Sequence, residues 1–273
     1  MPEALLRPEP VRALAALFDD GLPTPVPGDP LPPLWHWAAL PTWPPAGDSG
    51  PDGHPRHLTP PHPPGFPRRM FAGGNVRLLA PLTVGAVVER TVKVLSSVPK
   101  SGRRGEFVLS TVEIRLTRAD GVLAVVETQD IVYRRTAEPV VPAPAGEPVP
   151  AGEMAPALLS PAPEPGEWLL RTDPVRLMRF SAATANGHRI HYDLAYATGV
   201  EGYPGLVVQG PLMTLAMLET VRLRGAGPVT GVTHRNLQPL FCGQEARIRG
   251  TDELTLSTAS VHTSAHVATG GTP

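Results

Sequence analysis

The chain carries one sequence pattern twice, and this repeat limits its possible folds more than any other feature. Residues 77–85 read Arg-Leu-Leu-Ala-Pro-Leu-Thr-Val-Gly, and residues 235–243 read Arg-Asn-Leu-Gln-Pro-Leu-Phe-Cys-Gly. The central prolines (81 and 239) and the closing glycines (85 and 243) are each 158 positions apart. A weaker match, residues 11–19 against 177–186, precedes each segment. Two matches in the same order indicate a duplicated module, and two copies at this spacing exclude a solenoid.

A proline-rich segment separates the two copies. The chain has 36 prolines among 273 residues, and residues 136–165 combine many of them with alanine and glycine. Such a composition offers little that could pack, so we predict a semi-extended linker here. The predicted modules are then residues 1–135 and residues 166–273.

Two other segments are expected to be irregular. Residues 41–67 mix proline, glycine and three histidines, His54, His57 and His62. Metal binding is possible for them, but their irregular spacing favours an ordinary solvated surface loop. The tail, residues 257–273, is weakly strand-like and is expected to leave the last strand of the second module incomplete.

Both modules are expected to contain antiparallel strands. β-Branched residues and period-two alternation indicate strands in the first module, and Asp120-Gly121 is a hairpin turn between two of them. The strands predicted there are residues 87–95, 107–116 and 122–132. Weaker strands are predicted over residues 247–250, 254–258 and 264–268.

One helix is predicted over residues 211–224. Pro211 suits the first helical position, and Gly225 follows the last basic residue. The segment is apolar on most sides, so we expect it to be deeply buried. Its counterpart in the first module, residues 32–40, is short and aromatic. A helix wrapped by an antiparallel sheet, present twice, is an α+β double hotdog.

The composition excludes several classes of protein. With 24 basic and 25 acidic residues, nothing indicates binding to nucleic acid or to a membrane surface. The single cysteine, Cys242, allows neither an intramolecular disulfide nor a cysteine-based zinc site. No apolar run reaches the ~18 residues of a membrane span, and the N-terminus lacks the pattern of a signal peptide. We therefore expect a cytoplasmic protein.

Proton-transfer groups are concentrated in residues 180–193. Asn186, His188, His191 and Asp193 fall within eight positions between apolar runs, which is hard to explain as core. The chain then returns to apolar residues before the helix start at Gly210. Imidazole and carboxylate groups beside a helix N-terminus suit chemistry that passes through an enolate.

These segments resemble the MaoC-like double-hotdog hydratases and dehydratases of acyl thioesters. Within that group, the similarity is closest to the branch that hydrates 3-methylfumaryl-CoA (mesaconyl-C4-CoA) and itaconyl-CoA. It covers nearly the whole chain. The matching segments are residues 31–37, 50–55, 68–74, 129–134, 186–193, 201–208 and 210–212.

The resemblance implies a role for particular residues. The wider family pattern is Asp-x-Asn-Pro-x-His, whose histidine falls on His191 and whose aspartate position holds Asn186. It implies a non-catalytic first module and a catalytic second module, in which His191 is the acid/base and the N–H of Gly210 is the oxyanion donor. Asn186, which cannot act as a base, would orient water or the thioester carbonyl. The implied substrate is an acyl-CoA thioester, with no cofactor and no metal. Substrate-binding residues are expected at His188, Arg189, Tyr203 and Gln209.

Several alternatives stay open at this point. For His188, positioning the site and bonding a carbonyl are equal alternatives. Asp193 is expected to cap a following helix, and Arg189 is a candidate partner for a substrate carboxylate. For Arg68 and Arg69 we expect a solvated charge pair. Other readings of the whole chain are a dehydratase of longer 3-hydroxyacyl thioesters, a thioesterase, or a degenerate acyl-CoA-binding module. A fused pair of hotdogs is compatible with a monomeric pseudo-dimer or a homodimer.

Overall fold

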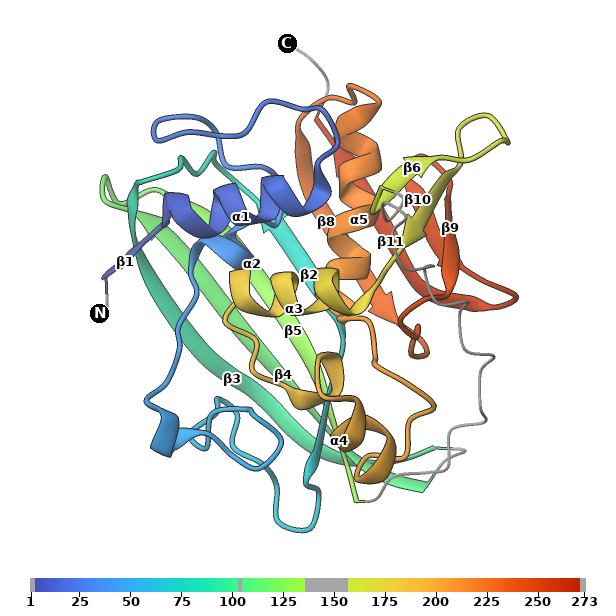
Figure 1. Ribbon diagram of the computed structural model, residues 1–273. Coiled ribbons are helices and arrows are strands. Elements are labelled where there is room, and N and C mark those ends of the chain that lie inside the picture. The colour runs from blue at the N-terminus through green and yellow to red at the C-terminus, as the bar shows by residue number, and fades with distance from the viewer. Residues whose placement is uncertain (1–2, 103–104, 136–156, 271–273) are drawn as a thin grey trace.

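The computed structural model describes residues 3–102, 105–135 and 157–270. The first module contains β1 (Glu3–Leu5), α1 (Pro8–Phe18), α2 (His36–Ala39), the 3-10 turn η1 (Ala46–Asp48), β2 (Arg68–Leu78), β3 (Val87–Gly102), β4 (Gly105–Arg118) and β5 (Leu123–Arg134). The second module contains β6 (Leu159–Pro161), β7 (Trp168–Arg171), α3 (Pro174–Ala183), η2 (Arg189–His191), α4 (Leu194–Gly199), α5 (Gly210–Leu223), β8 (Val229–Asn236), β9 (Glu245–Arg249), β10 (Glu253–Ser257) and β11 (Val261–Thr269). Figure 1 shows the helices on one side of a curved sheet.

All strands belong to one antiparallel sheet with an internal symmetry. Its order is β1-β3-β4-β5-β2-β8-β11-β10-β9-β7-β6, so that β2 and β8 join two similarly ordered halves. At this seam Asn75 pairs with Thr233, and the Asn75 amide donates to the Thr233 hydroxyl over 2.7 Å. These residues are also 158 positions apart. Equivalent positions of the repeat therefore meet at a pseudo-two-fold axis, and the α+β double hotdog is confirmed.

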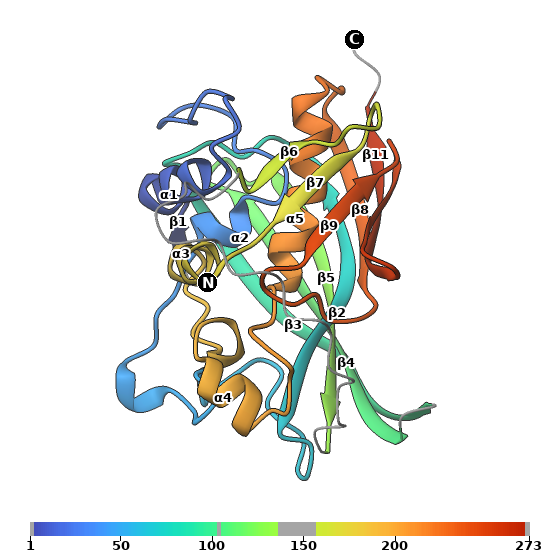
Figure 2. The same cartoon turned by 45° about the vertical axis from the view of Figure 1, so that its right-hand side comes forward.

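Helix α5 is the central helix of the second module, as predicted. Ten consecutive residues, 212–221, are buried, and the helix packs against β10, β11 and β2. Gly225, with φ of +65°, adopts the left-handed conformation that ends a helix. Figure 2 shows β6 and β7 crossing in front of this helix, with β8 and β11 beside it.

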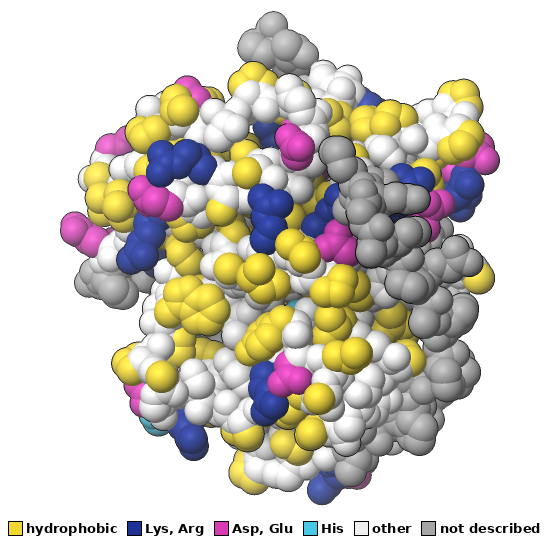
Figure 3. Space-filling view, viewed as in Figure 1, with side chains coloured by type: hydrophobic (Ala, Val, Ile, Leu, Met, Phe, Trp, Pro, Cys, Tyr) yellow, Lys and Arg dark blue, Asp and Glu magenta, His cyan; other side chains and the backbone are white. Residues whose placement is uncertain are grey.

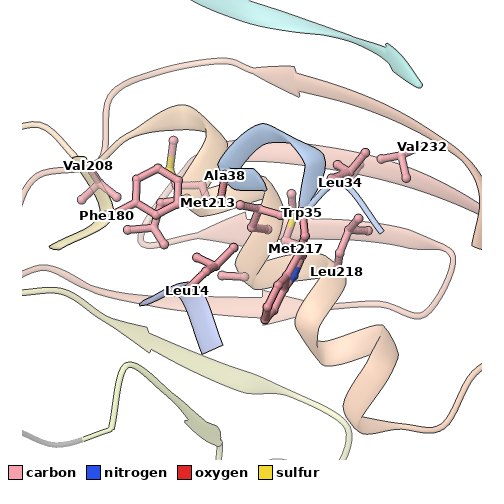
Figure 4. Close-up of a cluster of buried hydrophobic side chains, with 14 of the residues drawn as sticks. Leu14, Leu34, Trp35, Ala38, Phe180, Val208, Met213, Met217, Leu218 and Val232 are labelled. Atoms are coloured by element: carbon pink, nitrogen blue, oxygen red, sulfur yellow. The ribbon is translucent and has the colours of Figure 1, made fainter. Parts of the chain in front are cut away.

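The counterpart helix α2 has four residues and packs on α5 instead of filling a hotdog of its own. In Figure 4, Leu34, Trp35 and Ala38 lie beside Met213 and Met217 of α5. All five side chains are at most 2% exposed. The two modules therefore share one hydrophobic core.

The predicted strands and the Asp-Gly turn are confirmed, but β1, β2, β6, β7 and β8 lie outside the predictions. In β2 the glycines hide the strand pattern. A Cβ on Gly74 would lie 2.1 Å from the carbonyl oxygen of Thr128 on β5. Glycine is required there because a neighbouring backbone comes too close for a side chain.

Two boundaries differ from the sequence predictions. Of the predicted linker 136–165, residues 136–156 lie outside the described residues, and the end forms β6, which pairs with β7. Leu158 and Leu159 are buried, so this part packs with the second module. The prediction of an incomplete last strand was wrong, because β11 pairs with β8 on one side and β10 on the other.

The surface adds little to the functional argument. On the face drawn in Figure 3, basic and acidic side chains are interspersed, with hydrophobic side chains between them. Among the described residues, no helix combines the length and apolar character needed to cross a membrane.

Candidate active site

A cavity of about 530 Å³ is lined by both modules. The second module contributes the predicted residues Asn186, His188, His191, Tyr203 and Gly210 to its wall. The first module contributes charged and polar side chains, which are His36, His54, Arg69, Arg90, Glu127, Gln129 and Arg134. The cavity is large enough for the acyl part of a thioester.

The short turn η2 presents His191 to the cavity. Its Nδ1 lies 2.7 Å from the carbonyl oxygen of Val207. A carbonyl can only accept, so Nδ1 carries the hydrogen and Nε2 keeps its lone pair. Burial lowers the pKa of His191 to about 4, against a hydrogen bond to Val207 that raises it. His191 is thus a neutral imidazole near pH 7, ready to take a proton.

The first turn of α5 forms the wall near His191. Backbone N–H groups in the first turn of a helix have no partner within the helix, and the helix dipole is positive there. A Cβ at position 210 would lie 2.5 Å from the amide nitrogen of Asn236, so any larger residue there requires the Asn236 side chain to move. The arrangement can stabilise a developing oxyanion.

A loop of the first module reaches into the same site. Asp52 Oδ2 lies 2.9 Å from Nδ1 of His54, and the His54 ring packs against His188 with centroids 4.2 Å apart and the ring planes tilted by 37°. His188 in turn meets His191 edge-on at 5.4 Å. The prediction of a solvated loop was wrong for this part, since the His54 side chain is 13% exposed. The signal in the sequence was the match at residues 50–55.

Two glycines allow this loop to dock on the segment before His191. A Cβ on Gly53 would lie 1.8 Å from the carbonyl oxygen of Gly187, and one on Gly187 would lie 2.6 Å from that of Gly53. Two hydrogen bonds from Arg189 complete the contact, from its N–H to Asp52 O at 2.9 Å and from Nη1 to Pro51 O at 3.0 Å. The backbones of the two modules therefore meet directly at the site.

Replacing Gly53 by alanine should displace the loop. Gly53 has φ of +89°, so alanine brings both backbone strain and the clash with Gly187. We expect the free energy of unfolding to fall by at least ~2 kcal/mol, measured by urea denaturation. The matched control is Gly121→Ala, at φ of +83° with nothing within 4 Å, which should cost about 1 kcal/mol. Equal losses in the two variants would contradict the close approach.

Arg69 is a buried cation on the cavity wall. Its Nε is buried without a hydrogen-bond partner. Burial lowers the pKa of Arg69, against the Tyr133 hydroxyl, which raises it, and a guanidinium stays charged at neutral pH. Among the described residues no carboxylate lies within ion-pair distance of it, although the charge of Asp52, which pairs with His54, acts on it. The expectation of a solvated charge pair was wrong for Arg69, and Arg68 pairs with Glu201 at 2.5 Å.

The structure places two predicted substrate-binding residues outside the cavity wall. Arg189 pairs with Asp193 at 2.7 Å and lies over the ring of Tyr196. Gln209 is fully buried, and its amide donates to Leu177 O and to the hydroxyl of Ser181 on α3. Both side chains therefore bond to protein groups outside the cavity wall and hold neighbouring segments of the site in place.

Asp193 acts as a helix cap. Its Oδ1 accepts from the backbone N–H of Tyr196 at 3.0 Å, at the start of α4. The capping expectation is confirmed.

One cluster among the described residues has the side chains of a possible metal site. It contains Asp52, His54 and His188, whose potential metal-ligating atoms lie within 4.8 Å of one another. The 2.9 Å contact between Asp52 and His54 is an ordinary hydrogen-bond distance that needs no ion. Asp52 and His54 therefore form a hydrogen-bonded pair.

Comparison with known proteins bears on this site. Residues 34–242 match the family model described as hydroxyacyl-thioester dehydratase type 2. Mesaconyl-C(4)-CoA hydratase of Chloroflexus aurantiacus is 40% identical over 231 residues, which are 84% of this chain and 78% of that protein. The mitochondrial hydroxyacyl-thioester dehydratase type 2 of Schizosaccharomyces pombe is 37% identical over 84 residues, 30% of this chain and 28% of that protein.

Solved structures share the fold. HtdX of Mycobacterium tuberculosis superimposes with a TM-score of 0.64 at 20% identity, covering 98% of each chain. A MaoC-like dehydratase from Phytophthora capsici gives a TM-score of 0.65 at 14% identity, covering 98% of this chain and 95% of that one. At these identities the likeness concerns the fold alone.

Proposed function

Because the chain belongs to the hydroxyacyl-thioester dehydratase type 2 family of MaoC-like proteins, and is a hydro-lyase, we propose that it reversibly hydrates a short carboxylated enoyl-CoA of the 3-methylfumaryl-CoA or itaconyl-CoA type. The observation that favours a carboxylated substrate is the position of Arg69. A buried guanidinium without a carboxylate partner, on the wall of the cavity, matches a substrate that brings its own carboxylate. The relative from Chloroflexus, a mesaconyl-C(4)-CoA hydratase, supports the same substrate class.

The proposed reaction uses His191 as a single acid/base. Its Nε2 takes a proton from water while the water oxygen bonds to the β-carbon of the enoyl thioester. The electron pair of the double bond moves toward the thioester oxygen, where the N–H of Gly210 donates to the developing enolate. The imidazolium then returns its proton to the α-carbon, so His191 ends as it began.

Asn186 has a supporting part in this proposal. Its Oδ1 accepts from the N–H of His188 at 3.1 Å, which fixes the side chain beside the cavity. An amide cannot take a proton, but its Nδ2 can donate to the thioester carbonyl or to water.

The cavity wall contributed by the first module argues against long acyl chains. Arg69, Arg90 and Glu127 would have to lie against hydrocarbon if the substrate were a fatty acyl thioester. Burying charges against an apolar chain is unfavourable.

An absorbance assay for the loss of the enoyl-thioester double bond tests the proposal. The substrates are 3-methylfumaryl-CoA, itaconyl-CoA and crotonyl-CoA, and we expect turnover of a carboxylated thioester to exceed that of crotonyl-CoA. Absence of turnover on all three, or a preference for crotonyl-CoA, would contradict it.

The pH dependence should reflect the low pKa of His191. Burial, followed by the charge of His54, lowers this pKa to about 4, so the imidazole is a base above that value and loses activity as the pH falls through it. We expect kcat/KM to stay level from neutrality down to about pH 5, below the value near 6.5 of an exposed imidazole. An acid limb centred near pH 6.5, in protein shown to be folded by circular dichroism, would contradict this assignment.

A further inference from the structure

The second module alone offers few acceptors for an attacking water. His191 provides one, but Asn186 stands where the wider family pattern has an aspartate. Among the described residues, Glu127 is the acidic residue on the cavity wall. Its oxygens already accept from His36, Trp37 and Gln129 at 2.7 to 3.0 Å. A group that takes the place of the aspartate in the family pattern, as an acceptor for water, must therefore come from another part of the chain.

The first module supplies an acceptor of the required kind in His54. Asp52 Oδ2 can only accept, so Nδ1 of His54 carries the hydrogen of their 2.9 Å contact. Asp52 Oδ1 also accepts from the backbone N–H of His54 at 3.1 Å, which fixes the pair. This tautomer leaves Nε2 with its lone pair, and His54 lines the cavity beside His188. The docking of Gly53 on Gly187 holds the pair in place.

We propose that His54, oriented by Asp52, is a second catalytic residue, which holds the attacking water together with His191. The water directs one hydrogen to Nε2 of each imidazole, so its oxygen lone pair faces the β-carbon. The proton that leaves goes to His191 and returns to the α-carbon, and His54 keeps its hydrogen bond to the oxygen while that C–O bond forms. Asp52 is a positioning residue that acts through His54. The inference rests on the proposed function and assigns part of its chemistry to the module predicted to be non-catalytic.

Two conservative variants test the pair in the full-length protein. In Asp52→Asn the amide donates to Nδ1 of His54, which moves the hydrogen to Nε2 and turns the acceptor into a donor. We expect Asp52→Asn and His54→Gln each to lower kcat by about 10- to 100-fold, with KM changed by less than about threefold. The double variant should be no slower than His54→Gln, because Asp52 acts through that ring. His57→Gln, an exposed histidine of the same loop, should match the wild type.

The outcomes separate this inference from the proposed function. If the wild type hydrates none of the three thioesters, the proposed function fails. If the wild type is active and both variants keep more than half of its kcat, or if the losses fall on KM and thermal stability alone, the inference fails while the proposed function stands. Inactivation by EDTA that Zn²⁺ reverses would also overturn it, because the cluster would then be a metal site.

Discussion

Replacing His191 with alanine is expected to lower kcat by about 10³-fold or more on the preferred thioester. The imidazole would no longer be there to take the proton from water or to return it to the α-carbon, and general acid–base catalysis contributes about 10²–10⁴-fold to a reaction. Since His191 is proposed to carry out both steps, we expect the loss near the upper part of that range. The measurement is the steady-state rate of the absorbance assay over a range of substrate concentrations.

A second histidine serves as the control for His191. His266 lies on β11, is 54% exposed, and bonds to Glu253 far from the proposed chemistry. His266→Ala should keep the activity of the wild type. A His191→Ala variant that retains more than a tenth of the wild-type kcat, with its fold intact by circular dichroism, would refute the assignment of His191.

Replacing Arg69 with methionine should change which substrate is preferred. We expect kcat/KM for 3-methylfumaryl-CoA to fall by about 100-fold or more, because losing a charge-assisted pair with a carboxylate costs about 3 kcal/mol. For crotonyl-CoA, which has no carboxylate, the change should stay within about threefold. Methionine keeps the length of the stem, so packing against Tyr133 is largely retained.

The melting temperature of Arg69→Met is an independent test of the role of Arg69. A buried guanidinium without a carboxylate is costly, so the variant should melt no lower than the wild type in the absence of ligand. Arg77→Gln, an exposed change on the same strand β2, is the matched control and should alter neither property. Equal losses on both substrates would show that Arg69 does not recognise the acyl carboxylate.

The sequence predicts those parts of the molecule that depend on neighbouring residues. Helix α5 follows from Pro211, its apolar composition and Gly225, all within one short segment. The segment containing Asn186 and His191 is likewise local, because η2 follows closely after α3. The repeat predicts the symmetry of the sheet, because a duplicated module tends to pair as two identical chains would.

Contacts between distant residues could not be predicted in this way. The burial of Arg69 depends on Tyr133, and the place of His54 depends on the approach of Gly53 to Gly187. Proline and glycine around residues 50–55 are typical of an exposed loop. The family resemblance marks this segment, but its local pattern does not indicate that the second module covers it. In the same way, Arg189 resembles a substrate ligand until its pairing with Asp193 is seen.

The seam at Asn75 and Thr233 has a consequence for how such a site can change over time. In a dimer of identical hotdogs, every substitution occurs on both sides of the axis, so a residue that improves one wall of a site also alters the equivalent wall of the other. Joining the copies in one chain removes this constraint. Here the helix of one copy has the four residues of α2, while that of the other has the fourteen of α5. The copy with the shorter helix can then change as one wall of the site, and under the proposed function a single substitution at Arg69 is expected to shift the preferred acyl group without a mirrored change elsewhere.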